Sequence, residues 1–241
     1  MHRSIRNRWL RAALAALALA VLPGAAAAAP FAGGGWEVGY QSFDPGPVND
    51  ALRQSGMGYP ELPAQFLVFG GGGTSPLPMG DGGWSLTGFG AGGQAEARKP
   101  NGPLSRLALG YGGVRVGYER AVTDRLALGA GLGLAVGGLT LTAMKAEAGT
   151  VSGGLQTPQE VSFSRFLVLA IPDAGATLQL TPTMRLRLGV GYTWDPGVGT
   201  WKNVAGTSVG TEPALRMSGL RLGLTLLFGS EVDVRAETPG L

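Results

Sequence analysis

Apolar side chains recur at every second position in three stretches of this chain, with small or charged residues between them. Leu126–Val136 shows the pattern first, and Met184–Trp194 and Leu220–Phe228 repeat it. Because successive side chains of a strand point to opposite faces, each stretch has one apolar face and one face of small or charged residues. Stretches of about ten residues with this alternation are typical of strands that cross a membrane. The alternation therefore predicts membrane-spanning β-strands.

Further stretches with a similar though less regular pattern bring the predicted number of strands to eight. They are Trp36–Gln41, Ala64–Gly71, Gly83–Ala91, Leu104–Arg120 and Val161–Leu180. Eight strands bring both chain ends to one side, where Val122–Asp124 and Thr181–Thr183 make tight connections, and leave the longer loops on the other side. A closed ring also leaves no unpaired strand edge facing lipid. The predicted fold class is all-β, an antiparallel up-and-down transmembrane β-barrel.

Two of the predicted strands change phase at a pair of glycines. In Leu104–Arg120 the alternation shifts at Gly112-Gly113, and after Val136 it shifts again at Gly137-Gly138. A glycine pair can absorb one extra residue as a β-bulge without a Cβ clash. We therefore predict a bulge at each pair. Pro172 predicts a bulge or a break in the sixth segment, because proline cannot donate to a strand ladder.

One short helix is predicted in the long loop that follows the first strand. The loop spans Asp44–Pro63, and Asn49 is the candidate N-cap residue of the helix. The stretch Val48–Gln54 is also a candidate plug for the interior of the barrel.

The start of the chain has the organisation of a secretory signal peptide. A basic stretch without acids precedes an apolar stretch, Ala12–Leu22, and an alanine run that ends at Ala29. The apolar stretch is too short to cross a bilayer as a helix. We expect a signal peptide of the Sec type at 1–29, cleaved near Ala29, a barrel at 30–229 and a polar tail at 230–241.

The residue counts exclude several classes of function. The chain has no cysteine, and its one histidine, His2, lies in the predicted signal peptide. The mature protein therefore lacks an imidazole or thiolate for nucleophilic catalysis or for a zinc site, and we predict no metal and no cofactor. Four of the 19 Lys and Arg residues lie in the signal peptide, which leaves 15 against 16 acidic residues. The near-neutral remainder argues against nucleic-acid binding.

Taken together, the stretches from Gly35 to Gly229 resemble the small outer-membrane β-barrel proteins of Gram-negative-type bacteria, the eight-stranded OmpA-, OmpX- and OmpW-like group. The resemblance is one of pattern, without a family-specific motif. Leu220–Phe228 looks like the terminal strand of such proteins, which implies that the barrel-assembly machinery reads it during insertion. The chain departs from the pattern after the aromatic residue, because Ser230–Leu241 follows it.

Charged residues at the alternate positions are the candidate lumen-lining side chains. With the leucine faces on the lipid, the lumen receives Arg106, Arg115, Arg185, Arg187, Arg221, Glu37 and Glu119, and the sixth segment, whose phase is ambiguous, adds Arg165 and Asp173. Two interpretations stay open at this point. One is an ionic network that fills a narrow barrel, and the other is an arginine-lined path that favours anions.

Three functions remain compatible with the sequence. The leading hypothesis is a non-enzymatic integral protein of the outer membrane, in contact with its lipid, with a structural or surface-exposed role or as a conduit for an unidentified small solute. The second is a soluble exported β-sandwich or β-barrel that binds a ligand, with the apolar stripe as its core. The third is an outer-membrane enzyme, and the missing histidine makes it the weakest.

Overall fold

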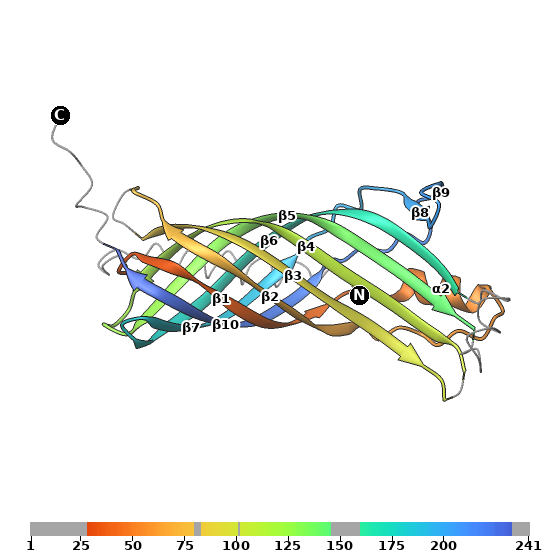
Figure 1. The fold of residues 1–241 in the computed structure, drawn as a ribbon, viewed down its shortest axis with the longest axis horizontal. Helices are drawn as coiled ribbons and strands as arrows, with labels where there is room; N and C mark the ends of the chain where they lie inside the picture. Colours follow the sequence, from red (N-terminus) through yellow and green to blue (C-terminus); the bar gives the residue numbers. More distant parts are fainter. Residues whose placement is uncertain (1–27, 80–82, 101, 146–159, 233–241) are drawn as a thin grey trace, which may run out of the picture.

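The computed structural model describes residues 28–79, 83–100, 102–145 and 160–232, and it is a closed barrel of antiparallel strands (Figure 1). The eight strands of its wall are β1 (Phe31–Ser42), β2 (Gln65–Pro76), β3 (Trp84–Arg98), β4 (Leu104–Ala121), β5 (Leu126–Met144), β6 (Glu160–Thr181), β7 (Met184–Thr193) and β10 (Gly219–Glu231). Each strand pairs with the next along the chain, and β1 pairs with β10 to close the ring. The predicted fold class and strand number are confirmed.

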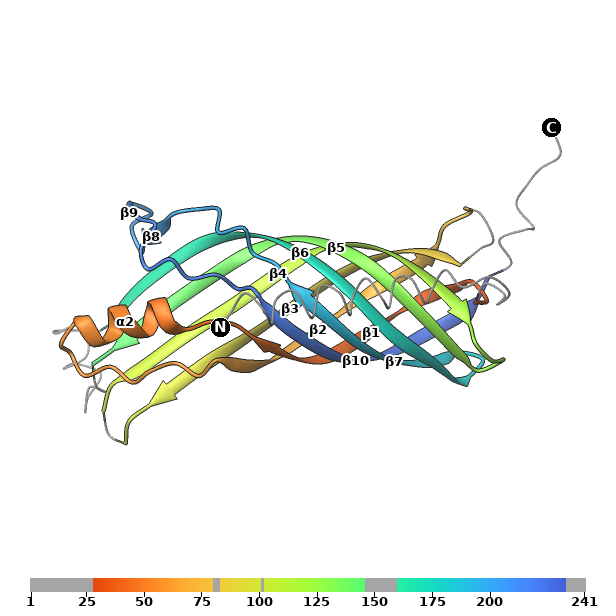
Figure 2. The same cartoon turned by 180° about the vertical axis from the view of Figure 1, so that it is seen from behind.

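The connections are short at one end of the barrel and longer at the other, as predicted, apart from the short connection at 99–103 between β3 and β4. The turn end, as we call it, carries the connections at 77–83, 122–125 and 182–183, together with the start of β1 and the end of β10. The loop end carries the other connections. Two of these contain regular structure, namely α2 (Gly46–Gln54) and the small strands β8 (Trp201–Asn203) and β9 (Ser208–Gly210) (Figure 2).

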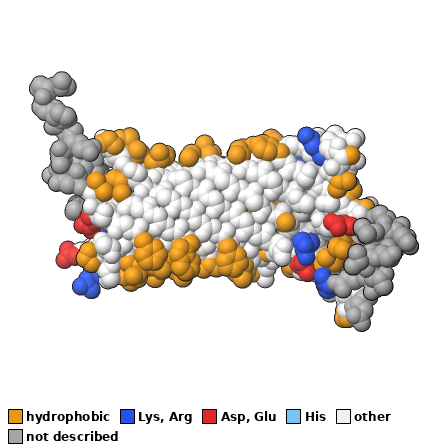
Figure 3. Space-filling model, viewed as in Figure 1, with side chains coloured by type: hydrophobic (Ala, Val, Ile, Leu, Met, Phe, Trp, Pro, Cys, Tyr) orange, Lys and Arg blue, Asp and Glu red, His pale blue; other side chains and the backbone are white. Residues whose placement is uncertain are grey.

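The outer surface of the barrel wall carries a band of exposed apolar side chains (Figure 3). Trp36, Phe69 and Leu188 are 64%, 62% and 62% exposed, an arrangement that water would oppose and lipid would favour. Charged side chains gather toward the two ends of the barrel in the same view. Several strands contribute to the band, and its residues include Val114, Leu128, Leu132, Leu134, Phe166, Leu222 and Phe228.

The predicted bulges at the two glycine pairs do not occur. Gly112 pairs with Gly90 on one side and Val136 on the other, and the register runs on unbroken through Gly113. The β5 register is equally regular at Gly137-Gly138. The phase change has another cause, which is that the apolar residues move from the outer face of the wall to its inner face.

This change of face gives the loop half of the barrel an apolar interior. On β4, Leu107 and Leu109 are 1% and 5% exposed, whereas Val114 and Val116 on the opposite face are 53% and 42% exposed. The inner residues of neighbouring strands join them in one core, which includes Phe66, Val68, Leu139, Leu141, Leu167 and Leu169. Placing Arg106 in the lumen implied that its neighbours Leu107 and Leu109 face lipid, and for these two residues that was wrong.

The sixth segment is one strand, and Pro172 does not divide it. The ladder between β6 and β7 is interrupted there, between the Asp173–Gly191 pair and the isolated bridge of Ala170 with Trp194. Because proline has no N–H to donate, its place in this gap leaves no ladder bond unmade on that side. The irregularity lies instead between Gln179 and Thr181, at the turn end.

Three further predictions need adjustment. The second and third strands extend well beyond their predicted ends, and β3 takes up residues that were expected to form a loop. Asn49 is not the N-cap of α2, because the helix begins three residues earlier, after Pro45. Its side-chain amide instead holds the two ends of the loop segment together. It donates to the Leu62 backbone carbonyl at 3.1 Å and accepts from the Leu62 backbone N–H at 2.8 Å.

Within the described ranges, no helix has the length and apolar character needed to cross a membrane. Nearly all of the predicted signal peptide, and residues 233–241 of the predicted tail, lie outside the described residues.

Candidate functional site

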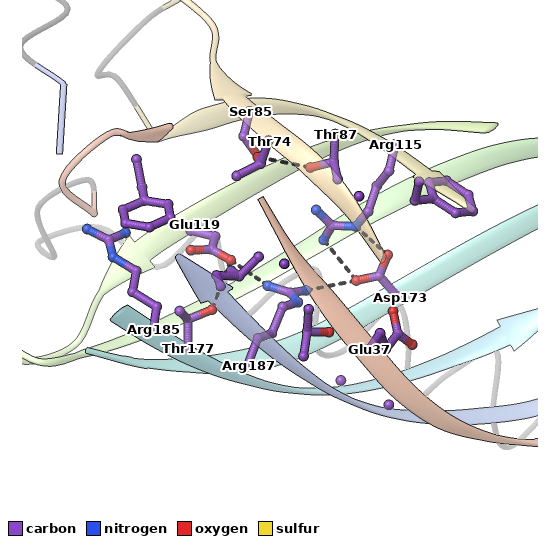
Figure 4. A pocket seen from close by; sticks show the side chains of 18 of the residues that line it. Glu37, Thr74, Ser85, Thr87, Arg115, Glu119, Asp173, Thr177, Arg185 and Arg187 are labelled. Carbon is purple, nitrogen blue, oxygen red and sulfur yellow. Dashed lines mark hydrogen bonds and ion pairs between the residues drawn. The ribbon is translucent and has the colours of Figure 1, made fainter. Parts of the chain in front are cut away.

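The lumen of the turn half holds a network of ion pairs that joins three strands (Figure 4). Arg115 of β4 binds Asp173 of β6 through two bonds, from Nε to Oδ2 at 2.6 Å and from Nη2 to Oδ1 at 2.8 Å. Arg187 of β7 reaches the same carboxylate at 2.8 Å and also pairs with Glu119 of β4. Thr177 donates to Glu119 at 3.0 Å. Two-pronged arginine–carboxylate bonds of this kind combine strength with fixed geometry.

A second ion pair lies on the strands that close the ring. Arg221 of β10 donates from Nη2 to Oε1 of Glu37 on β1 at 2.6 Å. The Tyr111 ring lies 6.0 Å from the Arg221 guanidinium carbon, so this pair adjoins the apolar core of the loop half. The predicted lumen residues Arg115, Glu119, Arg187, Arg221 and Glu37 therefore gather in one part of the interior.

Inward-facing glycines make room for these charged side chains. A Cβ atom on Gly131 would stand 2.5 Å from the Arg115 guanidinium carbon, and one on Gly129 would stand 2.6 Å from Cγ of Glu119. Gly223 and Gly117 face Glu37 and Arg115 even more closely. Glycines on the same strand or the adjacent one thus leave space on the inner wall over which the large charged side chains lie.

Arg185 lies apart from this network, toward the turn end. Its guanidinium carbon stands 4.3 Å from the centroid of the Phe31 ring, and its Nη2 pairs with Glu231 at 3.0 Å. It also donates to the Ala29 carbonyl at 3.3 Å. Arg185 therefore ties together the start of β1 and the end of β10.

Arg165 is buried at the other end, inside the loop half. It pairs with Asp195 at 2.7 Å, and the two side chains are only 3% and 0% exposed. Arg165 also donates to the Leu215 carbonyl at 2.5 Å, while Asp195 accepts from the Met217 amide at 2.9 Å. This ion pair holds the connection from β7 to β10 down on the barrel, and the alternation pattern could not identify Asp195 because it lies beyond the strand.

Arg106 does not line the lumen. It lies on the outer face of β4 toward the loop end, where it pairs with Glu96 of β3 at 2.8 Å, and its side chain is 39% exposed. The correction follows from the burial of Leu107 and Leu109, since Arg106 must then lie on the opposite face.

A cavity of about 170 Å³ adjoins the ionic network. Opposite the charged side chains, its lining includes the hydroxyls of Thr74, Ser85 and Thr87, and Thr74 and Thr87 are hydrogen bonded at 3.0 Å (Figure 4). The lining reaches Pro30 and Phe31 at the turn end. Among the described residues, no group of three or more acidic, histidine or cysteine side chains is placed to hold a metal ion.

Side chains from the loops pack against the inward leucines of the strands at the loop end. Val48 and Leu52 of α2 are 0% and 6% exposed, and Leu215 and Met217 of the last loop are both 0% exposed. All four belong to the same core cluster as the inward leucines of the strands. Val48 and Leu52, within the candidate plug Val48–Gln54, therefore lie in one apolar core with residues of the last loop.

The far side of α2 is polar and exposed. Arg53 pairs with Asp50 and with Glu61, the latter at 2.7 Å. The pKa of the Arg53 guanidinium is raised, first because its side chain donates a hydrogen bond to Glu61 and then by the charges of Glu61 and Asp50. These pairs face solvent and contribute little to stability.

Comparison with known proteins yields matches among solved structures alone, because no family model and no curated protein matches the sequence. Two structures of Ail, the attachment invasion locus protein of Yersinia pestis, one in complex with the heparin analogue sucrose octasulfate, are similar to this chain. Both are 12% identical, the match covers 84% of this chain and 98% of Ail, and the TM-scores are 0.43 and 0.42. Independently of these matches, the closed ring of eight antiparallel strands and the apolar outer band are the features that the sequence's resemblance to the small outer-membrane barrels predicts.

Proposed function

We propose that this protein is a non-enzymatic integral protein of the outer membrane whose barrel holds a folded loop structure at one surface and conducts no solute. The observation that carries the proposal is the closure of the loop half. Inward leucines of β4, β5 and β6 pack against α2 and against Leu215 and Met217, and Leu139, Leu167 and Leu169 are each 0% exposed. A packed apolar core of this kind leaves ions no hydrated path.

The arginines of the turn half support a structural role as well. Arg115, Arg187 and Arg221 each bind a carboxylate of a neighbouring strand or of one further round the ring. Their positive charge is therefore balanced inside the barrel, whereas an anion path needs guanidinium groups that a passing anion can reach. The network braces the wall, and it is the first of the two interpretations that the sequence left open.

The exposed apolar band supports a membrane location over a soluble binding protein. Side chains such as Trp36, Phe69 and Leu188 would stand in water on a soluble barrel. Export by a Sec-type signal peptide at 1–29, contact with outer-membrane lipid and insertion by the barrel-assembly machinery are parts of the same proposal. The mature chain has no histidine or cysteine, which supports a role without catalysis.

Reconstitution into planar bilayers tests the closure. We expect no steady conductance steps from the mature protein, since the apolar core fills the loop half. A triple variant, Leu139→Gly, Leu167→Gly and Leu169→Gly, should conduct when the core is emptied. Steady, ion-selective steps from the unaltered protein would contradict the proposal and restore the conduit hypothesis.

Location and activity are tested separately. We expect the protein to fractionate with outer membranes, to resist extraction by carbonate, and to migrate differently on gels before and after heating. A monodisperse, detergent-free monomer would favour the soluble alternative. Hydrolysis of lipid or peptide substrates by the purified barrel would contradict the non-enzymatic role.

A further inference from the structure

A second hollow lies at the loop end, between α2 and the segment that contains β8 and β9. Its volume is about 330 Å³. Its lining includes Ala51 and Leu52 of α2, Phe163 of β6 and Trp201 of β8. We call it the outer cleft, and it is distinct from the cavity beside the ionic network.

The walls of the outer cleft are held in place by contacts outside it. Trp201 is 1% exposed, and its indole Nε1 donates to the Pro213 carbonyl at 2.9 Å. The Arg165 guanidinium carbon lies 5.6 Å from the Trp201 ring. The two hydrogen bonds between the Asn49 side chain and the Leu62 backbone fix α2. The cleft is therefore preformed, as small-molecule sites usually are.

The rim of the cleft exposes apolar side chains to solvent. Val161 at the start of β6 and Val209 of β9 are 47% and 49% exposed, and both line the hollow. They lie at the loop end of the barrel. Apolar surface of this kind, around a concave site, is typical of a surface that a ligand covers.

A single charged side chain, Glu212, is among the described residues that line the cleft. It is exposed, and its Oε2 accepts a hydrogen bond from the Ala214 amide at 3.2 Å. An acidic group at the edge of an otherwise apolar hollow favours a ligand with a cationic head. The volume lies at the small end of the range of about 300–1,000 Å³ for ligand pockets, which suits one short alkyl chain or one aromatic ring.

We propose that the outer cleft binds a small amphipathic cation, with its apolar chain or ring against Phe163 and Val209 and its ammonium group beside Glu212. The site is reached from the aqueous side at the loop end. It does not depend on whether the lumen conducts, so this proposal and the proposed function can fail separately.

Calorimetric titration of the mature protein in lipid nanodiscs tests the proposal. The probes are hexyltrimethylammonium, hexanesulfonate and hexanol, which share the chain and differ in the charge of the head, with empty nanodiscs as the blank. We expect the cation to bind saturably at one site and the anion at least several-fold more weakly. Equal binding of anion and cation would overturn the assignment, and so would the absence of saturable cation binding.

Three variants locate the bound probe. Ala51→Trp fills the cleft from an exposed position of α2 and should abolish saturable binding, and Ser55→Tyr on the next turn is a second way to fill it. Gln54→Trp is the matched control, because Gln54 does not line the cleft. Retained binding in both filling variants, with heat-modifiable migration intact, would overturn the proposal.

Removal of the charge tests the head group. Glu212→Gln should weaken cation binding about two- to fivefold, as expected for an exposed ion pair, and leave hexanol binding unchanged. Glu61→Gln, which removes another exposed carboxylate of the loop end, is the control and should change neither. An unchanged cation affinity in Glu212→Gln would contradict the placement of the ammonium group.

Discussion

The two halves of the lumen are filled by opposite kinds of side chain. In the turn half, inward glycines lie beside arginine and carboxylate side chains, and these charged groups are held by ion pairs around a cavity. In the loop half, inward leucines pack with loop side chains into a dry core. An eight-stranded barrel has an interior just wide enough for side chains to fill. The comparison shows that one wall can be filled by charge at one end and by hydrocarbon at the other.

The difference between the halves is also one of water access. Arg115 and Asp173 keep 15% and 18% side-chain exposure beside the cavity, whereas Arg165 and Asp195 are almost fully buried. A charge that loses its partner therefore retains some hydration in the turn half and loses almost all of it in the loop half. The predictions below use this contrast, and each is measured by urea titration of the protein folded in lipid vesicles, followed by tryptophan fluorescence.

Removal of the buried acid in the loop half should have the largest effect. Asp195→Ala leaves the Arg165 guanidinium without its carboxylate partner in a dry core, and we expect the free energy of unfolding to fall by about 3–5 kcal/mol. Asp50→Ala, on the exposed face of α2, is the matched control and should change it by less than about 1 kcal/mol. Equal effects of the two variants would remove the distinction between buried and exposed pairs.

Truncation of the apolar core should come next. Leu139→Ala removes a side chain that is 0% exposed and should destabilise the barrel by about 2–5 kcal/mol, since the cavity is not refilled by water. Leu134→Ala on the same strand is the control, because that side chain is 57% exposed on the outer face and lipid can occupy the space it leaves. A larger loss of unfolding free energy for Leu134→Ala than for Leu139→Ala would contradict the assignment of the inner and outer faces of β5.

Removal of the shared acid in the turn half should cost less than removal of Asp195. Asp173→Ala leaves Arg115 and Arg187 unpaired beside the cavity, and we expect a loss of about 1–3 kcal/mol because water from the cavity can solvate them. The matched variant Asp173→Asn keeps the size and one acceptor, so it should lose less. A loss as large as that of Asp195→Ala would show that the turn half is as dry as the loop half.

The outer ion pair should have the smallest effect. Arg106→Ala breaks the exposed pair with Glu96 and should change the free energy of unfolding by no more than about 1 kcal/mol. Arg115→Ala serves as the contrast, because Arg115 lies on the inward face of the same strand. It should lower the free energy of unfolding clearly more. A large loss for Arg106→Ala, with Arg115→Ala harmless, would reverse the assignment of the two faces.

Most of the fold could be predicted from the sequence, and much less of the lumen. The alternation located all eight barrel strands, but it missed the start of β1 and the ends of β2 and β3, where glycines and small polar residues give little contrast between faces. It did not predict the short strands β8 and β9. Of the predicted lumen charges, Arg106 lies outside, and Asp195 was not found because it lies in a loop. The signal peptide and the tail remain predictions.

The sequence by itself determined which side chains share a face of each strand, because the period of two is a local property of an extended backbone. It also determined that the barrel can close, because the number of alternating stretches and the short connections between them can be counted directly in the sequence. Only the tertiary structure decided which face meets lipid at each level. Leu107 and Leu132 look alike in the alternation, yet one is 1% exposed in the core and the other is 51% exposed on the outer wall. The choice depends on what the loops place in the lumen, where α2, Leu215 and Met217 provide the loop half with an apolar partner from distant parts of the chain.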